Sequence, residues 1–224
     1  MRVSCVLCLA ALVVPAIFMT GCGKPSESTS EPAPSEKKKP VEIPLDSLPP
    51  LSGTLPPLDD GRVEIAPPPN WHIPSRSSEY VVRFQITRKR RYPIIAVTGE
   101  DYETVFNVSD KGTAETFAQQ RSAAMAGEGV TLAQKVTPLR VGPHWGIAYM
   151  KQGKDKNNII DQMIFETVVD GRKYKYEMRM LTGDFEKHKS IFFAVVGRTK
   201  FLRPAPSKKP AGEASNEPDA GGSP

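Results

Sequence analysis

Cysteine is scarce in this sequence of 224 residues, and none lies beyond residue 22. The three cysteines are Cys5, Cys8 and Cys22. The rest of the chain therefore has no thiol for a disulfide, a thiolate metal site or a cysteine nucleophile. A folded domain built from it must rely on an ordinary hydrophobic core.

Motifs for catalysis and metal binding are also missing. The sequence has no GxSxG elbow, no P-loop, no GxGxxG and no HExxH. Its three histidines, His72, His144 and His188, are isolated from one another, which indicates no zinc site. We therefore predict no catalytic residue, no metal and no cofactor, and expect that the protein is not an enzyme. An enzyme with an unrecognised site is kept as an alternative.

Single polar and aromatic residues have plain structural interpretations. His188 lies between Phe185 and Phe192 at helical spacing, which favours a partly buried packing histidine over a ligand. Trp71 and Trp145 are interpreted as packing residues. The carboxylates at positions 100, 101 and 103 are interpreted as a solvated loop, because the spacing of an EF-hand is absent.

No apolar run is long enough to be read as a membrane-spanning helix. The longest extends from Val3 to Met19, contains Pro15, and falls short of the roughly 20 residues that a spanning helix needs. It follows Arg2 and ends in small residues, as the first two regions of a secretory signal do.

The end of this run, Met19-Thr20-Gly21-Cys22, resembles the lipobox of bacterial lipoproteins. The resemblance implies signal cleavage after Gly21, acylation of the Cys22 sulfur and of the new amino group, and hence a palmitate-type lipid anchor. Two or three acyl chains make membrane attachment effectively permanent. Gly23 stands where the family's inner-membrane retention signal has Asp, which favours the outer membrane if the cell has two. A secreted form and a retained helix are the alternatives.

The sequence predicts four regions. Residues 1–21 form the signal peptide, and residues 22–60 form the lipidated cysteine with a Pro-, Ser-, Glu- and Lys-rich linker that is expected to be disordered. Leucines 45, 48, 51, 55 and 58 have helix-like spacing, but the intervening prolines prevent a helix, and the end of the linker can lie along the domain. Residues 61–203 form one globular domain, and residues 204–224 a disordered tail.

The charge is spread unevenly. Residues 22–60 carry four Lys and seven acids, a net charge of −3, whereas residues 61–203 carry 23 Lys and Arg against 15 acids, a net charge of +8. A basic domain favours anionic partners such as phospholipid headgroups, envelope polymers or acidic proteins. The alternative is that the charge only keeps the domain soluble.

The domain is expected to be α+β, an antiparallel sheet packed with about two helices. The alternation of Val82, Phe84 and Ile86 with polar residues predicts a half-buried strand. Further strands are expected at 63–65, 94–97, 105–108, 131–137, 145–151 and 159–169. Asp170-Gly171 predicts a type I′ hairpin turn into a strand with Tyr174, Tyr176, Met178 and Met180 on its buried face and Lys173, Lys175, Glu177 and Arg179 facing water.

Two helices complete the pattern. Thr113 is expected to cap a helix over 114–125 with Ala114, Phe117, Ala118, Ala124 and Met125 near one face. A second helix is expected over 184–200, with a core-facing stripe at Phe185, Phe192, Val195, Val196 and Thr199.

The order of these elements is similar to the PsbP/Mog-type sandwich family. The resemblance rests on Pro69-Asn70-Trp71, the helix opening at residues 113–118, the hairpin with Asp170-Gly171-Arg172 and Tyr174, and the closing helix with Phe185 and Phe192. Members of this family are binding or accessory proteins, so the resemblance implies a non-catalytic role. The family has no shared catalytic residue to carry over, and fold alone does not define function.

One polar feature stands above the background, the basic turn Arg88-Lys89-Arg90-Arg91. Four adjacent cations can bind phosphate or an acidic protein, and the alternative is a solvated turn. We therefore expect a membrane-anchored envelope lipoprotein that acts as a binding or accessory module for an envelope protein. The alternative is an electrostatic binder of anionic lipid or polymer through this turn. A nucleic-acid partner is disfavoured, because the anchor places the domain outside the cytoplasm.

Overall fold

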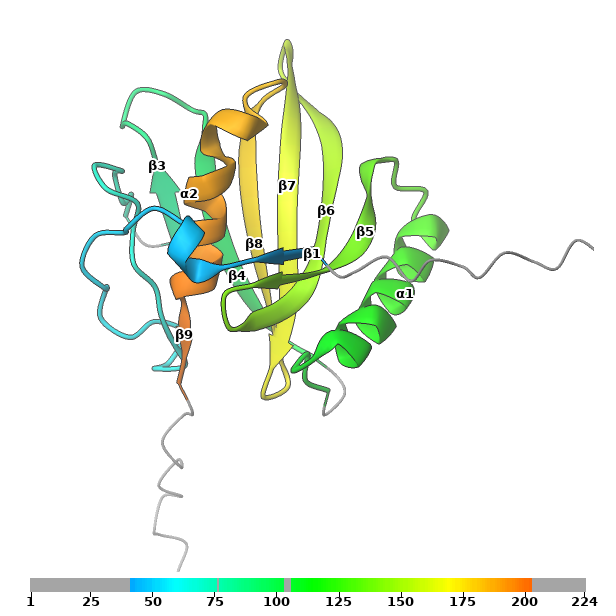
Figure 1. The fold of residues 1–224 in the computed structure, drawn as a ribbon. Coiled ribbons are helices and arrows are strands. Elements are labelled where there is room, and N and C mark those ends of the chain that lie inside the picture. Colours follow the sequence, from blue (N-terminus) through cyan, green and yellow to red (C-terminus); the bar gives the residue numbers. More distant parts are fainter. Residues whose placement is uncertain (1–40, 76, 103–105, 203–224) are drawn as a thin grey trace, which may run out of the picture. The chain divides into compact units, whose positions relative to one another are not determined.

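The computed structural model describes residues 41–75, 77–102 and 106–202. These residues form two sheets and two α-helices (Figure 1). The predicted signal peptide, Gly21 and Cys22, the linker residues 22–40 and the tail 204–224 lie outside the described residues. Within the described ranges, no helix has the length and apolar character needed to cross a membrane.

The larger sheet has seven strands among the described residues, in the order β1-β5-β6-β7-β8-β4-β3. Its strands are β1 (Val41–Ile43), β3 (Val82–Gln85), β4 (Ile94–Asp101), β5 (Leu132–Val141), β6 (His144–Asp155), β7 (Asn158–Val169) and β8 (Arg172–Leu181). Neighbouring strands are antiparallel except β1 and β5, which are parallel. The expected α+β class is confirmed, but the sheet is mixed.

Three shorter elements and two helices complete the domain. β2 (Val63–Glu64) pairs with β9 (Lys200–Phe201), and η1 (Leu45–Ser47) is a single 3-10 turn. The helices are α1 (Lys111–Gly127) and α2 (Phe185–Arg198).

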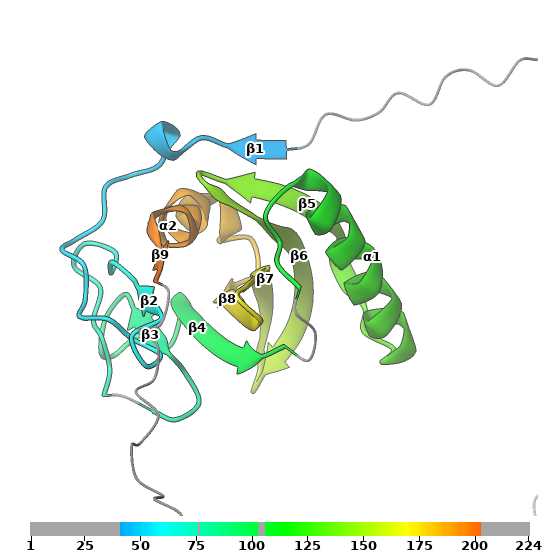
Figure 2. The ribbon, with the colours of Figure 1, turned by 90° about the horizontal axis from the view of Figure 1, so that it is seen from below.

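The large sheet is curved and carries one helix on each face (Figure 2). On the concave face, Tyr176 and Met178 of β8 pack in one core with Phe192 and Val195 of α2. On the convex face, a second core contains Phe117 of α1 and strand residues that include Ile147, Tyr149, Ile164 and Val168. The predicted helix stripes are confirmed except at Ala124, which is exposed.

The predicted hairpin is confirmed, because both Asp170 and Gly171 have positive φ, at 49° and 71°. The alternation along β8 is also confirmed on its apolar side, where Tyr174, Tyr176, Met178 and Met180 are all at most 2% exposed. The prediction that the polar side faces water is wrong for Glu177, which is only 4% exposed, and Lys173, Lys175 and Arg179 are half-buried. Arg179 and Lys175 cover the Glu177 carboxylate with ion pairs of 2.5 and 3.1 Å.

Helix α1 begins earlier than predicted because Asp110, not Thr113, is its N-cap residue. The Asp110 carboxylate accepts a hydrogen bond from the Thr113 N–H at 2.9 Å, and the Thr113 hydroxyl accepts one from the Asp110 N–H at 3.1 Å. This reciprocal capping box satisfies two backbone donors at the helix start. The strand expected at 105–108 is wrong for residues 106–108, where Val108 makes one bond to Val168 without forming a ladder.

The predicted linker boundary at residue 60 is also wrong, because residues 41–60 lie on the domain. β1 pairs with β5, with Val41 opposite Leu139 and Ile43 opposite Val141. Leu48 and Leu58 are 7% and 8% exposed and belong to the concave-face core. Leu45, Leu51 and Leu55 are partly buried and pack against the same core. Apart from the 3-10 turn η1, which contains Leu45, the segment is not helical, as its prolines require. We call residues 41–58 the strap.

Candidate functional site: an apolar groove at the edge of the sheet

β3 is an edge strand whose outer side is only partly paired. At its end, the His72 and Gln85 backbones exchange hydrogen bonds of 2.7 and 2.9 Å. In an antiparallel strand, alternate residues direct both backbone groups to the same side. Arg83 therefore presents its N–H and C=O on the same outer edge as Gln85. Apart from β3 itself and its partner β4, no described residue makes a backbone hydrogen bond with Arg83.

The strap forms the opposite wall. Residues 52–58 run extended and antiparallel to residues 63–67, held by bonds from the N–H groups of Ser52, Leu55 and Leu58 of 2.9, 3.0 and 2.8 Å. These bonds engage the N–H groups of Ser52, Leu55 and Leu58 with the carbonyl oxygens of residues 63–67. Pro56 and Pro57 have no backbone donor, so none of these five residues offers a free N–H to β3, and the strap forms a mainly apolar wall.

A tight turn fixes the end of this wall. Asp59, Asp60 and Gly61 all have positive φ, from 52° to 80°. Arg172 of β8 donates two hydrogen bonds from its guanidinium to the Asp59 carboxylate, and the Tyr174 hydroxyl donates a third at 2.8 Å. Because a bidentate Arg–carboxylate pair is rigid, it anchors the left-handed turn to the sheet.

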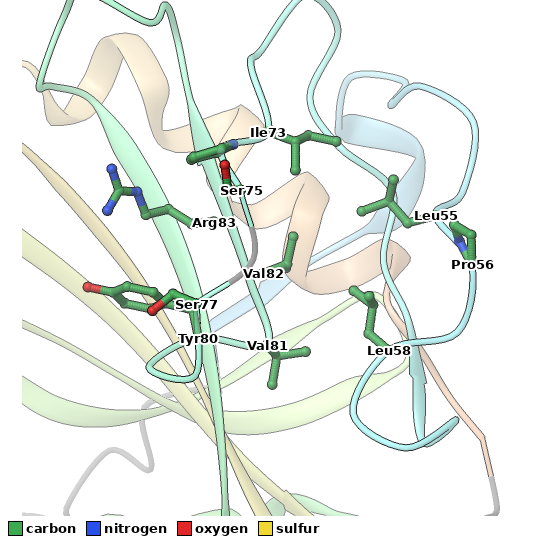
Figure 3. A pocket seen from close by; sticks show the side chains of 11 residues that line it. Leu55, Pro56, Leu58, Ile73, Ser75, Ser77, Tyr80, Val81, Val82 and Arg83 are labelled. Carbon is green, nitrogen blue, oxygen red and sulfur yellow. The ribbon is translucent and has the colours of Figure 1, made fainter.

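Between the two walls lies a groove of about 300 Å³ (Figure 3). Leu55 and Leu58 line it from the strap, Val82 lines it from β3, and Ile73, which is 39% exposed, lines it from the segment before β3. Tyr80 and Arg83 lie on the other side of β3, so the groove extends around the edge of the strand. The remaining lining residues are Pro56, Pro74, Ser75, Ser77 and Val81. An apolar cleft with a few polar groups is the usual composition of a binding site.

Arg83 is the cation of this groove. Its guanidinium carbon lies 5.9 Å from the centre of the Tyr80 ring, a cation–π contact that orients the side chain. No carboxylate of the described residues lies within 4.0 Å of it. The side-chain amide of Gln85 also lies against this guanidinium. The groove thus combines apolar walls, an outward strand edge and a cation that has no carboxylate partner among the described residues.

The predicted basic turn lies elsewhere, between β3 and β4. Its four side chains are exposed, and Arg91 forms an ion pair with Asp155 at 2.8 Å. Arg90 and Arg91 line an open cleft of about 500 Å³ together with Lys187 and His188 of α2. The structure therefore brings part of the turn to a shared surface with α2, but not to the groove.

His144, His188 and the two tryptophans make packing contacts. The rings of Trp71 and His188 meet edge to face at 6.5 Å, as expected for a packing histidine. His144 Nε2 lies 2.8 Å from the Thr199 carbonyl oxygen, and burial lowers the pKa of His144. Trp145 packs against the Arg140 guanidinium at 5.8 Å. Within the described ranges, no three His, Cys, Asp or Glu side chains gather as a metal site would require.

Two of the three predicted acidic-loop residues are strand residues instead. Glu100 and Asp101 end β4 and pair with Lys173 and Arg172 of β8. The hydrogen bond from Lys173 lowers the pKa of Glu100. Position 103 lies outside the described residues.

Sequence reasoning did not find the groove. Apart from Val82 and Arg83 of β3, its residues come from the strap and from the connection before β3. Both of these segments appear as proline-rich loops in the sequence. The one available signal was the repeated leucine in the strap, because apolar residues in a polar, proline-rich segment indicate burial against a domain.

A curved mixed sheet with one helix on each face places the domain in the α+β class of two- and three-layer folds. Neither the protein-family models nor the curated protein sequences contain a match to this sequence.

Similar folds occur among solved structures. A crystal structure from Bacteroides thetaiotaomicron has a TM-score of 0.51 at 6% identity and covers 68% of this chain; the match spans about half, 49%, of that protein. Cyanobacterial PsbP (CyanoP) from Synechocystis matches with a TM-score of 0.44 at 16% identity, over 67% of this chain and 92% of its own. LpqN, involved in cell envelope biogenesis of Mycobacterium tuberculosis, matches with a TM-score of 0.42 at 8% identity, over 63% and 83%. At these identities the likeness concerns the fold alone.

Proposed function

We propose that this chain is a lipoprotein anchored in the cell envelope through Cys22, and that its domain is a non-catalytic accessory module for an envelope protein. The groove beside β3 carries this proposal. In it, an extended segment of the partner adds to the edge of the sheet and packs its apolar side chains between β3 and the strap.

Strand addition explains the geometry of the edge. An outward backbone N–H and C=O beside an open groove form a ready template for another strand. In strand-addition complexes, main-chain hydrogen bonds give affinity and pockets for alternate side chains give specificity. The backbone of Arg83 supplies the main-chain donor and acceptor, and the apolar groove supplies the pocket for side chains.

The lining residues define the chemistry of the partner segment. Leu55, Leu58 and Ile73 can pack against an aliphatic or aromatic side chain, and the guanidinium of Arg83 can donate hydrogen bonds to a carboxylate nearby. The expected partner segment is therefore extended, contains alternating apolar residues, and carries an acidic residue beside them.

Site-specific crosslinking in cells tests the proposal. A photoreactive amino acid replaces Ile73 in the groove and, in a matched control, Lys135, an exposed residue of β5. Mass spectrometry then identifies the attached peptide. We expect one saturable partner segment from position 73 and none from position 135.

The Cys22→Ala form serves as a second control. Loss of the anchor should release the protein from the membrane, so crosslinks that only reflect proximity at the membrane should disappear. Capture of the same proteins from both positions, or of none from position 73, would contradict the accessory role.

A further inference from the structure

Three connections meet at one end of the domain (Figure 1). They are residues 86–93 between β3 and β4, residues 154–159 around the β6–β7 hairpin, and residues 181–187 at the start of α2. The Arg91–Asp155 ion pair joins the first two, and a 3.3 Å bond from the Thr182 N–H to the Ile159 carbonyl joins the last two. We call these three segments the basic end.

The basic end has a strong excess of positive charge. Its cations are Arg88, Lys89, Arg90, Arg91, Lys154, Lys156 and Lys187, against the carboxylates of Asp155, Asp184 and Glu186. Two of the carboxylates already pair within this end, Asp155 with Arg91 and Asp184 with Lys187. Arg88, Lys89 and Arg90 are exposed, and no carboxylate of the described residues lies within 4.0 Å of them.

Exposed aliphatic side chains accompany these cations. Four large hydrophobic residues of the described chain are exposed, and two of them, Ile159 at 54% and Leu181 at 42%, lie at the basic end. Leu181 lines the same cleft as Arg90 and Lys187. Cations that surround exposed aliphatic groups are typical of a surface that rests in the headgroup region of a membrane, where the charges meet phosphate and the aliphatic groups reach the acyl boundary.

We propose that the basic end docks on an anionic phospholipid bilayer. Arg88, Lys89 and Arg90 contact lipid phosphates, and Ile159 and Leu181 insert among the headgroups. The aliphatic pair favours a bilayer over a nucleic acid or an anionic polymer, because those ligands attract the cations but give no apolar environment to Ile159 and Leu181. This surface is separate from the groove, so the inference goes beyond the accessory role.

Vesicle co-sedimentation tests this docking. The protein is the mature chain from residue 22 onward with Cys22→Ala, so that no acyl chain attaches it. The vesicles contain equal parts phosphatidylglycerol and phosphatidylcholine, with pure phosphatidylcholine for comparison. We expect binding to the anionic vesicles alone, and binding that weakens as salt rises.

Three variants separate the contributions. Since each Lys or Arg near an anionic surface contributes about fivefold, R88Q/K89Q/R90Q should lower the partition coefficient by at least about tenfold. Arg91 is left intact because it pairs with Asp155. I159S/L181S should lower the partition coefficient by at least about threefold, because both side chains lose apolar contact.

The control variant R62Q/K111Q/K200Q also removes three charges, but from the vicinity of β2, α1 and β9, and should change the partition coefficient by less than about twofold. Unchanged binding of R88Q/K89Q/R90Q, or an equal loss in the control, would overturn the proposal. Loss in the charge variant with full binding of I159S/L181S would overturn the insertion of the aliphatic pair, and with it the reason for preferring a bilayer to a soluble polyanion. Thermal unfolding of each variant confirms that it is folded.

Discussion

At the scale of single residues, Glu177 shows how the sheet stabilises the ionised form of a buried carboxylate. Burial raises the pKa of Glu177, but the hydrogen bond from Arg179 and the charge of Lys175 outweigh it, so that its pKa lies below the ordinary value. A carboxyl group whose pKa is lowered by folding stabilises the fold above its unfolded pKa of about 4.3, and that contribution is lost as the pH falls through the folded value.

Glu177→Gln should therefore lower the free energy of unfolding by about 1–3 kcal/mol at neutral pH, because it removes charge-assisted bonds from a buried site. In strong acid the free energies of unfolding of the two proteins should become similar, since Glu177 is then protonated in the unsubstituted protein as well. Urea denaturation at both pH values measures the difference, and Glu186→Gln, at an exposed site of α2, is the control. An equal deficit at both pH values would contradict the pKa argument.

At the scale of elements, the strap is part of the folded domain. Leu48 is buried against the concave-face core, and its carbonyl accepts a bond of 3.3 Å from the Arg198 guanidinium of α2. Leu45 lies over Gly197, where an added Cβ would come within 3.2 Å of the leucine side chain. The strap thus stabilises α2 and at the same time forms one wall of the groove.

Leu48→Ala should destabilise the domain by about 2–4 kcal/mol, the usual cost of a cavity at a buried leucine. Val41→Ala is the matched control in the same segment, because Val41 is 63% exposed, and it should change stability by less than about 0.5 kcal/mol. Chemical denaturation measures both. If Leu48→Ala were as neutral as Val41→Ala, the strap would not be part of the folded core.

The elements differ in how well their sequence predicts them. β8 was predictable because its alternation and the Asp170-Gly171 turn are local signals. β1 was not, because three residues show no period and their position depends on parallel pairing with β5, almost a hundred residues later. The groove had no local sequence pattern for the same reason, because its two walls, the strap and β3, are far apart in the sequence. The basic turn, by contrast, was visible as four adjacent cations.

At the scale of the whole molecule, two surfaces lie on one domain. The groove follows the edge of β3, and the basic end contains the connection that leaves β3 toward β4. If both proposals hold, a partner strand binds beside β3 while the basic end rests on the membrane. The acylation of Cys22 and the outer-membrane destination stay predictions of the sequence.

The most direct test of strand addition compares two substitutions at Arg83 in the crosslinking experiment from position 73. Both Arg83→Ala and Arg83→Pro remove the guanidinium, but only proline also removes the outward N–H, and proline is tolerated at such a site on an edge strand. Because one lost hydrogen bond that leaves an unpaired acceptor costs about 1–3 kcal/mol, Arg83→Pro should capture about tenfold less partner than Arg83→Ala. Equal capture by two folded variants would contradict the addition of a partner strand to β3.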